Sequence, residues 1–99
     1  MSKQTIRIVV QLTALTDKTA EVQVILQALV APTRLETGCL DYQLLRNSSN
    51  TSEFLFIEEW IDQKAMDIHF TTPHIQEALA KVTPLLAATP NIQKYELLA

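Results

Sequence analysis

The chain has 99 residues, of which 47% are hydrophobic and 19% charged, and its formal net charge at pH 7 is −3. This length fits one domain, residues 1–99, and the apolar composition excludes an intrinsically disordered chain. The eight Lys and Arg residues are scattered, which excludes the basic footprint of a nucleic-acid-binding protein, and so apolar a surface on so small a domain favours a homo-oligomer.

The first part of the chain predicts a strand followed by a long helical segment. Residues 5–14 alternate strongly apolar with mixed positions, which indicates a strand with one buried face. Thr16 or Asp17 can cap a helix that runs to about residue 31, with a buried stripe at helical spacing: Val22, Ile25, Leu26 and Leu29. Pro32 predicts a kink or a restart, and the helical segment ends at Gly38, where a left-handed cap is expected.

The second part predicts a hairpin, a broken helix and a last strand. Residues 39–46 and 54–61 have strand character, and the polar residues 47–52 between them form the clearest turn signal of the chain. Asp62 can cap a short helix, and Thr72-Pro73 restarts it, because proline is favoured at the first helical position. The restarted helix has an apolar stripe that ends near Pro84 and Pro90, and residues 92–98 form the last strand; the stripe consists of Ile75, Ala78, Leu79, Val82 and Leu86.

The resulting order of elements is β-α-β-β-α-β, which is typical of the α+β ferredoxin-like or split βαβ fold. In this fold an antiparallel sheet carries both helices on one face and leaves its other face bare. Here the bare face holds many apolar residues, so we expect a second sheet to cover it. The sequence therefore predicts a homodimer of ferredoxin-like domains.

Targeting signals and metal motifs are not found in the sequence. The N-terminal segment is interrupted by polar residues such as Arg7 and Gln11, so it lacks the apolar core of a signal peptide. No stretch approaches the length of a membrane span, and no basic amphipathic segment would bind a membrane surface. We therefore expect a cytoplasmic protein. Cys39, the one cysteine, is expected to pack as a small hydrophobe, and no Cys/His cluster has zinc spacing, so no metal is expected.

Three motifs span much of the chain. They are TRLETGCLDY at residues 33–42, EEW at residues 58–60, and AMDIHFTTPH at residues 65–74. They resemble the T-R-x-E-x-G-C-x-x-Y, E-x-W and A-x-x-x-H-x-x-T-P-H motifs of the antibiotic biosynthesis monooxygenase family. The resemblance implies a dimeric α+β barrel, in which two sheets pack face to face and each protomer holds a pocket between its helices and its sheet.

His69 is the first candidate for a catalytic role. It shares a helix face with Ala65 and Met66, and a histidine with a pKa near 6.5 exchanges a proton near neutrality. Trp60 and Glu58 are the next catalytic candidates: the indole can form a flat wall, and the carboxylate lies in phase with it on an apolar strand face. Each of the three also has a structural interpretation: a satisfied core histidine, a packed tryptophan, and a carboxylate paired with Arg34 or Arg46 instead of orienting His69.

Five further side chains are expected to bind the substrate: Tyr42, Phe56, Met66, Phe70 and His74. Tyr42 can donate to a substrate oxygen, although burial with a satisfied hydroxyl is the commoner fate of such a residue. His74 is expected at a pocket rim or a dimer contact, because a helix N-terminus disfavours its cation. Arg34 and Glu36 are expected to form a partly exposed ion pair.

The leading functional hypothesis is a cofactor-free monooxygenase that acts on a small quinol-like or phenolic substrate and molecular oxygen. A single glycine excludes glycine-rich nucleotide loops, so no cofactor is expected. The family resemblance also allows haem degradation, but the haem-degrading members have an asparagine on the first strand, whereas the first strand here carries Gln11 and no asparagine. An isomerase and a non-catalytic ligand-binding dimer are also compatible with the sequence, because the fold alone does not choose among these functions.

Overall fold

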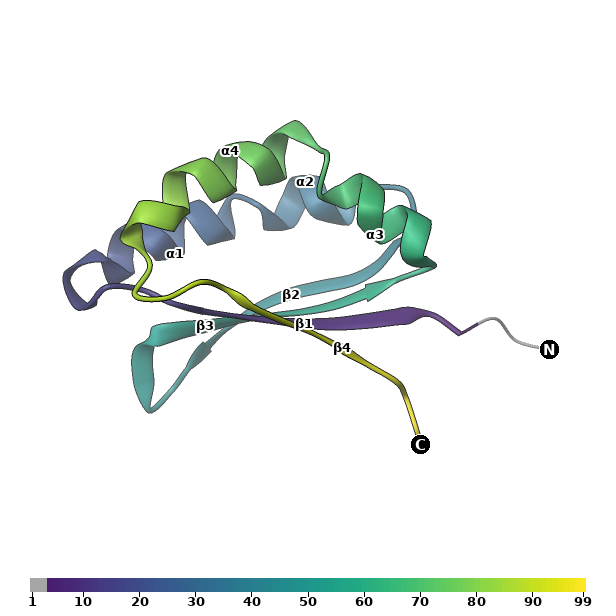
Figure 1. Ribbon diagram of the computed structural model, residues 1–99, viewed down its shortest axis with the longest axis horizontal. Helices are drawn as coiled ribbons and strands as arrows, with labels where there is room; N and C mark the ends of the chain where they lie inside the picture. The colour runs from purple at the N-terminus through teal and green to yellow at the C-terminus, as the bar shows by residue number, and fades with distance from the viewer. Residues whose placement is uncertain (1–3) are drawn as a thin grey trace.

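The computed structural model describes residues 4–99, and its elements follow the predicted order (Figure 1). Two short 3₁₀ turns, η1 (Thr16–Lys18) and η2 (Thr83–Leu85), accompany the main elements. The strands are β1 (Ile6–Thr13), β2 (Cys39–Asn47), β3 (Asn50–Trp60) and β4 (Asn91–Tyr95). The helices are α1 (Thr19–Gln27), α2 (Val30–Arg34), α3 (Gln63–His69) and α4 (Pro73–Val82).

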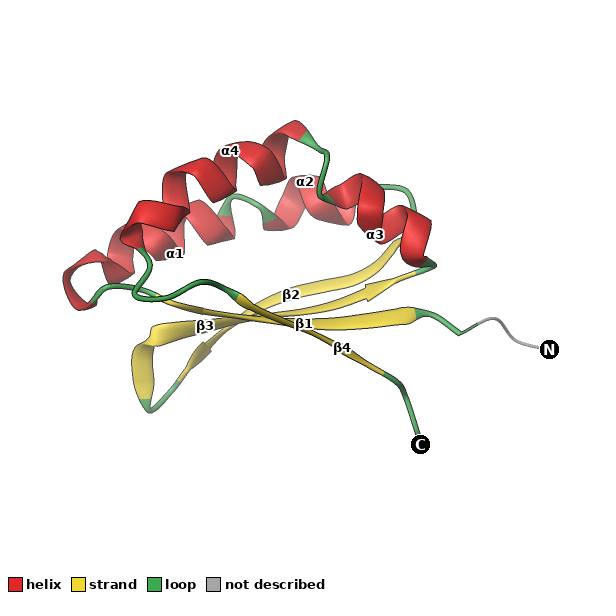
Figure 2. Ribbon diagram, viewed as in Figure 1, coloured by secondary structure: helices red, strands yellow, loops and turns green. Residues whose placement is uncertain are grey.

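The four strands form one sheet of order β2-β3-β1-β4, in which every neighbouring pair is antiparallel. In the described part of the chain, the four helices lie on one face of this sheet and none lies on the other (Figure 2). This arrangement confirms the predicted α+β ferredoxin-like fold. Within residues 4–99, none of the helices is long and apolar enough to cross a membrane.

The helix-covered face of the sheet carries the buried residues of the strands, as the alternation predicts. The register places Tyr42 of β2 beside Glu58 of β3, which in turn pairs with Ile8 of β1. A carboxylate therefore lies in the middle of an apolar face. The buried residues on β1 and β3 are Ile8, Val10, Leu12, Phe54, Phe56, Glu58 and Trp60.

The uncovered face holds a mixture of apolar and polar side chains. Val9 and Ile57 lie opposite each other in its centre, with Leu55 and Leu45 in the next row. Polar contacts surround them, including the ion pair of Arg7 with Glu59 at 3.4 Å. The expected second sheet over this face stays a prediction.

The first helical segment differs from the prediction at its start and in its middle. Thr16 and Asp17 fall in η1, and α1 begins only at Thr19, with no side-chain cap. The first helix ends at Gln27, before the expected residue 31, and α2 restarts at Val30. Pro32 is tolerated because it lies in the first turn of α2, where its missing N–H has no partner within the helix.

Three more boundaries also differ. The hairpin turn is tighter than residues 47–52, because Asn47 Oδ1 accepts hydrogen bonds from the N–H groups of Ser49 and Asn50 at 2.8 and 3.2 Å. Leu86 lies after η2, where it forms an isolated bridge with Ala14. The last strand ends at Tyr95 instead of residue 98.

The predicted end of the helical segment at Gly38 is wrong, because α2 ends at Arg34 and Gly38, although left-handed, lies in the turn before β2. The signals at Asp62 and Pro73 are confirmed, and all three residues lie at the end of the sheet where the candidate site lies. Gly38 has a φ of +88°, and a Cβ at this position would lie 2.6 Å from Ala65 Cβ. This close approach packs the start of β2 against α3. Asp62 caps α3 by accepting a hydrogen bond from the N–H of Ala65 at 2.9 Å, and Pro73 begins α4 after Thr72.

Candidate active site

A cavity of about 100 Å³ lies between the sheet and the helices. Its wall is apolar except for three side chains that carry chemistry: Tyr42, Glu58 and His69. Such a cavity, with a few convergent polar groups, is the usual form of a small-molecule site. The remaining lining residues are Val10, Leu12, Leu26, Leu29, Phe56, Phe70, Ile75, Ala78, Leu79, Val82, Pro90 and Ile92.

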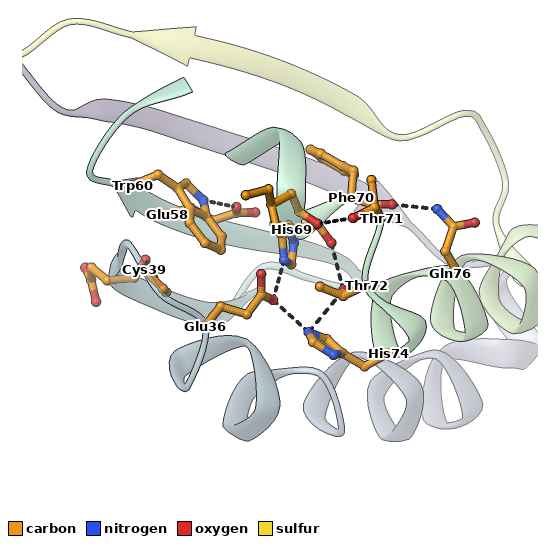
Figure 3. Close-up of polar contacts among 12 residues, drawn as sticks. Glu36, Cys39, Glu58, Trp60, His69, Phe70, Thr71, Thr72, His74 and Gln76 are labelled. Atoms are coloured by element: carbon orange, nitrogen blue, oxygen red, sulfur yellow. Dashed lines mark hydrogen bonds and ion pairs between the residues drawn. The ribbon is translucent and has the colours of Figure 1, made fainter. Parts of the chain in front are cut away.

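His69 is the last residue of α3, and its side chain is 1% exposed. Its ring lies against the indole of Trp60, with centroids 4.7 Å apart, and edge-on to Tyr42 at 5.8 Å. Nδ1 lies 2.7 Å from Oε2 of Glu36, which reaches it from the loop between α2 and β2 (Figure 3). One end of the imidazole is therefore anchored to a carboxylate, while the ring itself lines the cavity.

Glu36 holds two histidines through one oxygen. Its Oε2 lies 2.7 Å from Nδ1 of His69 and 2.7 Å from Nε2 of His74 (Figure 3). A carboxylate oxygen accepts hydrogen bonds, so we assign a proton to both of these ring nitrogens. We therefore assign neutral His69 as the Nδ1–H tautomer, whose Nε2 lone pair is available. Within residues 4–99, this Nε2 has no hydrogen-bond partner.

The protonation of His69 follows from two opposing effects. Burial lowers the pKa of His69, because an imidazolium loses its hydration in the interior, while the hydrogen bond and charge of Glu36 raise it. The net direction is downward, so burial prevails. A neutral imidazole at physiological pH can accept a proton from a bound substrate.

Glu58 is the second carboxylate of the site, and it is 4% exposed. Its Oε1 accepts a hydrogen bond from Nε1 of Trp60 at 2.9 Å. Burial raises the pKa of Glu58 to about 7, and the charge of Glu36 adds to the rise, while the Trp60 hydrogen bond opposes it. Burial also raises the pKa of Tyr42, with a smaller effect from Glu58, so this phenol stays protonated and can donate a hydrogen bond.

Comparison with known proteins gives this site a family context. The sequence model described as antibiotic biosynthesis monooxygenase matches residues 5–81. The chain belongs to the antibiotic biosynthesis monooxygenase family. YcnE of Bacillus subtilis, named as a proposed monooxygenase, is 35% identical over 71 residues, which cover 72% of this chain and 75% of YcnE.

Two further similarities define how far the relationship extends. The uncharacterised protein sll1783 of Synechocystis is 35% identical over 81 residues, covering 82% of this chain but only 55% of sll1783. This chain thus spans about half the length of that relative. The crystal structure of PA3566 from Pseudomonas aeruginosa superposes with a TM-score of 0.93 at 29% identity, covering 100% of this chain and 99% of that chain.

The family fold brings together most of the side chains expected from the sequence to form the site. The expected residues that line the cavity are Tyr42, Phe56, Glu58, His69 and Phe70. Trp60 and Met66 are buried in the core and do not line it, although Trp60 contacts both His69 and Glu58. His74 lies outside the cavity and is 25% exposed, with its ring directed at Glu36.

The expected partners of Glu58 and Glu36 are wrong. Glu58 binds the Trp60 indole and neither Arg34 nor Arg46, because Arg34 Nε donates to the backbone carbonyl of Tyr42 at 3.0 Å. Arg46 donates to Gln23, at the far end of the hairpin. The orienting carboxylate of His69 is Glu36, for which the sequence predicted an ion pair with Arg34.

Cys39 lies beside the site without taking part in it. It packs against the core, and its Sγ lies 3.9 Å from the carbonyl oxygen of Asp41. Burial raises the pKa of this thiol to about 11, with a further contribution from the charge of Glu36. A thiol that stays protonated is a poor nucleophile, in agreement with its expected packing role.

Proposed function

We propose that this chain is a cofactor-independent monooxygenase that acts on a small quinol-like or phenolic substrate, with His69 as the general base. The observation that carries the proposal is the pairing of His69 Nδ1 with Glu36 at the wall of an apolar cavity. This pairing leaves Nε2 as the nitrogen that can take a proton. Relatives named as proposed monooxygenases support the reaction class.

The chemistry needs a substrate that becomes electron-rich when it loses a proton. His69 Nε2 accepts the hydroxyl proton, and the resulting phenolate donates electrons to molecular oxygen, so that a carbon–oxygen bond forms. One oxygen atom stays in the product as a new carbonyl. The second oxygen atom leaves as water, with two hydrogens that come from the substrate. The substrate supplies all the electrons, so the reaction balances without an added reductant.

Three more side chains have roles in this proposal. Glu36 is a positioning residue, because it fixes the tautomer of His69 without reaching the cavity wall. Tyr42 can donate a hydrogen bond to the substrate oxyanion. Glu58, with a pKa of about 7, can return a proton to a peroxide oxygen as water leaves. The apolar wall excludes bulk water and thereby strengthens these interactions.

The homodimer is part of the proposal. The central apolar residues of the uncovered face, Val9, Leu55 and Ile57, support it, because a second sheet would remove them from water. Sedimentation velocity at micromolar concentration tests it directly. A species of one chain mass, 11.2 kDa, would contradict the dimer and leave the site of the single chain unaffected.

Oxygen consumption tests the proposed reaction. The chelator-treated protein is assayed with reduced quinones and hydroxylated aromatics beside His69→Ala, and Glu59→Gln on the opposite face serves as the matched control. We expect uptake above autoxidation that falls by roughly tenfold or more in His69→Ala and stays unchanged in Glu59→Gln. Circular dichroism checks that each variant is folded. The absence of uptake with every compound would favour a non-catalytic binding dimer or an isomerase.

A further inference from the structure

Glu36, His69 and His74 form a cluster that the proposed reaction uses only in part. Their three nearest ligand atoms, one from each side chain, all lie within 4.8 Å of one another. They come from the α2–β2 loop, the end of α3 and the start of α4. His74 has no role in proton abstraction at the cavity, and yet its ring is aimed at the same oxygen as that of His69.

The lone-pair directions of the two imidazoles converge. Each ring nitrogen is 2.7 Å from Glu36 Oε2, and a hydrogen bond and a metal bond use the same direction at an imidazole nitrogen. The two nitrogens lie within 4.8 Å of each other, so they would have to approach before a zinc ion near the present position of this oxygen could lie about 2.1 Å from both. The carboxylate would then draw back by the length of a metal–oxygen bond, and the two nitrogens would settle about 3.4 Å apart, as tetrahedral geometry requires.

The second carboxylate oxygen of Glu36 gives independent support for a bound ion. Oε1 is buried and has no hydrogen-bond partner among residues 4–99, although a buried carboxylate oxygen normally has one. A metal ion would satisfy it through bidentate or alternating coordination. Glu36 and Thr72 also line an outer hollow on the side of Ala65 and Ile68, so this carboxylate borders a second hollow that is separate from the apolar cavity.

We propose that Glu36, His69 and His74 form a zinc-binding site, with water in the fourth position. Two imidazoles and one carboxylate are a ligand set that zinc takes up with an open position, whereas magnesium prefers oxygen ligands alone. Local spacing in the sequence links only His69 with His74 and does not reveal Glu36 as the third ligand. These ligands are separated by 33 residues between Glu36 and His69 and by 38 between Glu36 and His74.

Zinc at this site would prevent His69 from acting as a general base. A metal on Nδ1 displaces the proton that Glu36 now accepts, and neutral imidazole then carries its proton on Nε2. The nitrogen that accepts the substrate proton would become a donor. Zinc is thus an inhibitor of the proposed reaction and not its cofactor. Only this consequence rests on the proposed function, because the binding site itself rests on the geometry.

The test is a zinc titration of the chelator-treated protein against a chromophoric competitor. We expect one zinc per chain, no competition by magnesium, and at least about tenfold weaker zinc binding in His74→Asn and in Glu36→Gln. Two variants serve as controls. Glu59→Gln makes the same Glu-to-Gln change on the uncovered face of the sheet, and Cys39→Ala removes the thiol that lies beside the site. Both controls should bind as the unaltered chain does. Unchanged affinity in His74→Asn, or a loss of binding in Cys39→Ala, would overturn the assignment.

Two readouts separate this inference from the proposed reaction. In ¹⁵N spectra of the imidazoles, zinc should move the proton of His69 from Nδ1 to Nε2, and an unchanged tautomer at saturating zinc would refute the site. In the oxygen assay, zinc should abolish oxygen uptake by the unaltered chain, whereas oxygen uptake by the His74→Asn variant should be resistant to zinc. Zinc binding with no uptake under any condition would contradict only the proposed reaction. Zinc-insensitive uptake would contradict only the inhibitory site.

Discussion

The buried carboxyl of Glu58 makes the stability of the protein depend on pH in a direction opposite to that of most carboxylates. Glu58 is 4% exposed, and within residues 4–99 its side chain has one hydrogen-bond partner, the indole N–H of Trp60 at 2.9 Å. Burial raises the pKa of Glu58 from 4.5 to about 7, against the effect of this hydrogen bond. The folded state therefore favours the protonated carboxyl.

The sign and size of the effect follow from this difference. Below pH 4.5 the group is protonated in both states, and it contributes no difference. As the pH rises from 4.5 to about 7, only the unfolded state ionises, so the free energy of unfolding falls. Each pH unit of that interval is worth about 1.4 kcal/mol, which gives a total loss of about 3 kcal/mol. Roughly 2.5 kcal/mol of this loss falls between pH 5 and pH 8.

Glu58→Gln isolates this contribution from all remaining titrating groups. The amide keeps the shape of the side chain and an oxygen that accepts from Trp60, but it cannot ionise. Urea unfolding of both proteins at pH 5, 6, 7 and 8, at one protein concentration, gives the difference in free energy at each pH. Between pH 5 and pH 8, we expect the free energy of unfolding of the variant to rise by about 2.5 kcal/mol relative to that of the unaltered chain. Parallel pH profiles would refute the reasoning, because they would mean that Glu58 titrates alike in both states.

Three further changes test separate parts of the structure. Trp60→Phe removes the hydrogen bond that lowers the pKa of Glu58, so the ¹³C carboxyl titration of Glu58 should move upward by roughly one pH unit; an unchanged titration would contradict the contact. Gly38→Ala should lower the free energy of unfolding by about 2–4 kcal/mol, because φ is +88° and the added Cβ would lie 2.6 Å from Ala65 Cβ. A loss below about 0.5 kcal/mol would argue against this close approach. Asp62→Ala removes the cap of α3 and should cost about 1 kcal/mol in chemical unfolding, whereas Asp62→Asn should retain most of the stability.

The fold was predictable because its signals are local. Alternation along residues 5–14 identifies the buried face of β1, and the only glycine and the Asp62 cap directly precede the starts of β2 and α3. Each of these signals depends on backbone geometry within a few residues. The start of α1 was harder to predict for the same reason: Thr16 and Asp17 are good capping residues, but the chain there forms a 3₁₀ turn before the helix begins.

The partners of the charged side chains were not predictable in this way. Periodicity correctly places Glu58 and His69 on the buried faces of their elements, but it does not say which buried groups meet. Glu36 lies in a loop, where no periodicity exists, and its partners are more than 30 residues away. The motif at residues 33–42 contains Glu36 and offered the one available signal, but it indicated only the family resemblance and not the contact with His69.

The two carboxylates of the site have different hydrogen-bond donors. Glu36 receives N–H groups from two imidazoles on one oxygen. Glu58 receives one indole N–H in an apolar wall and also lies within the field of Glu36, so its protonated form prevails up to about pH 7. Glu36 can thus fix the tautomer of His69, while Glu58 retains a proton that it can donate. This division depends on the fold, since residues 36, 58 and 69 belong to three different segments and meet only when α3 packs over β3.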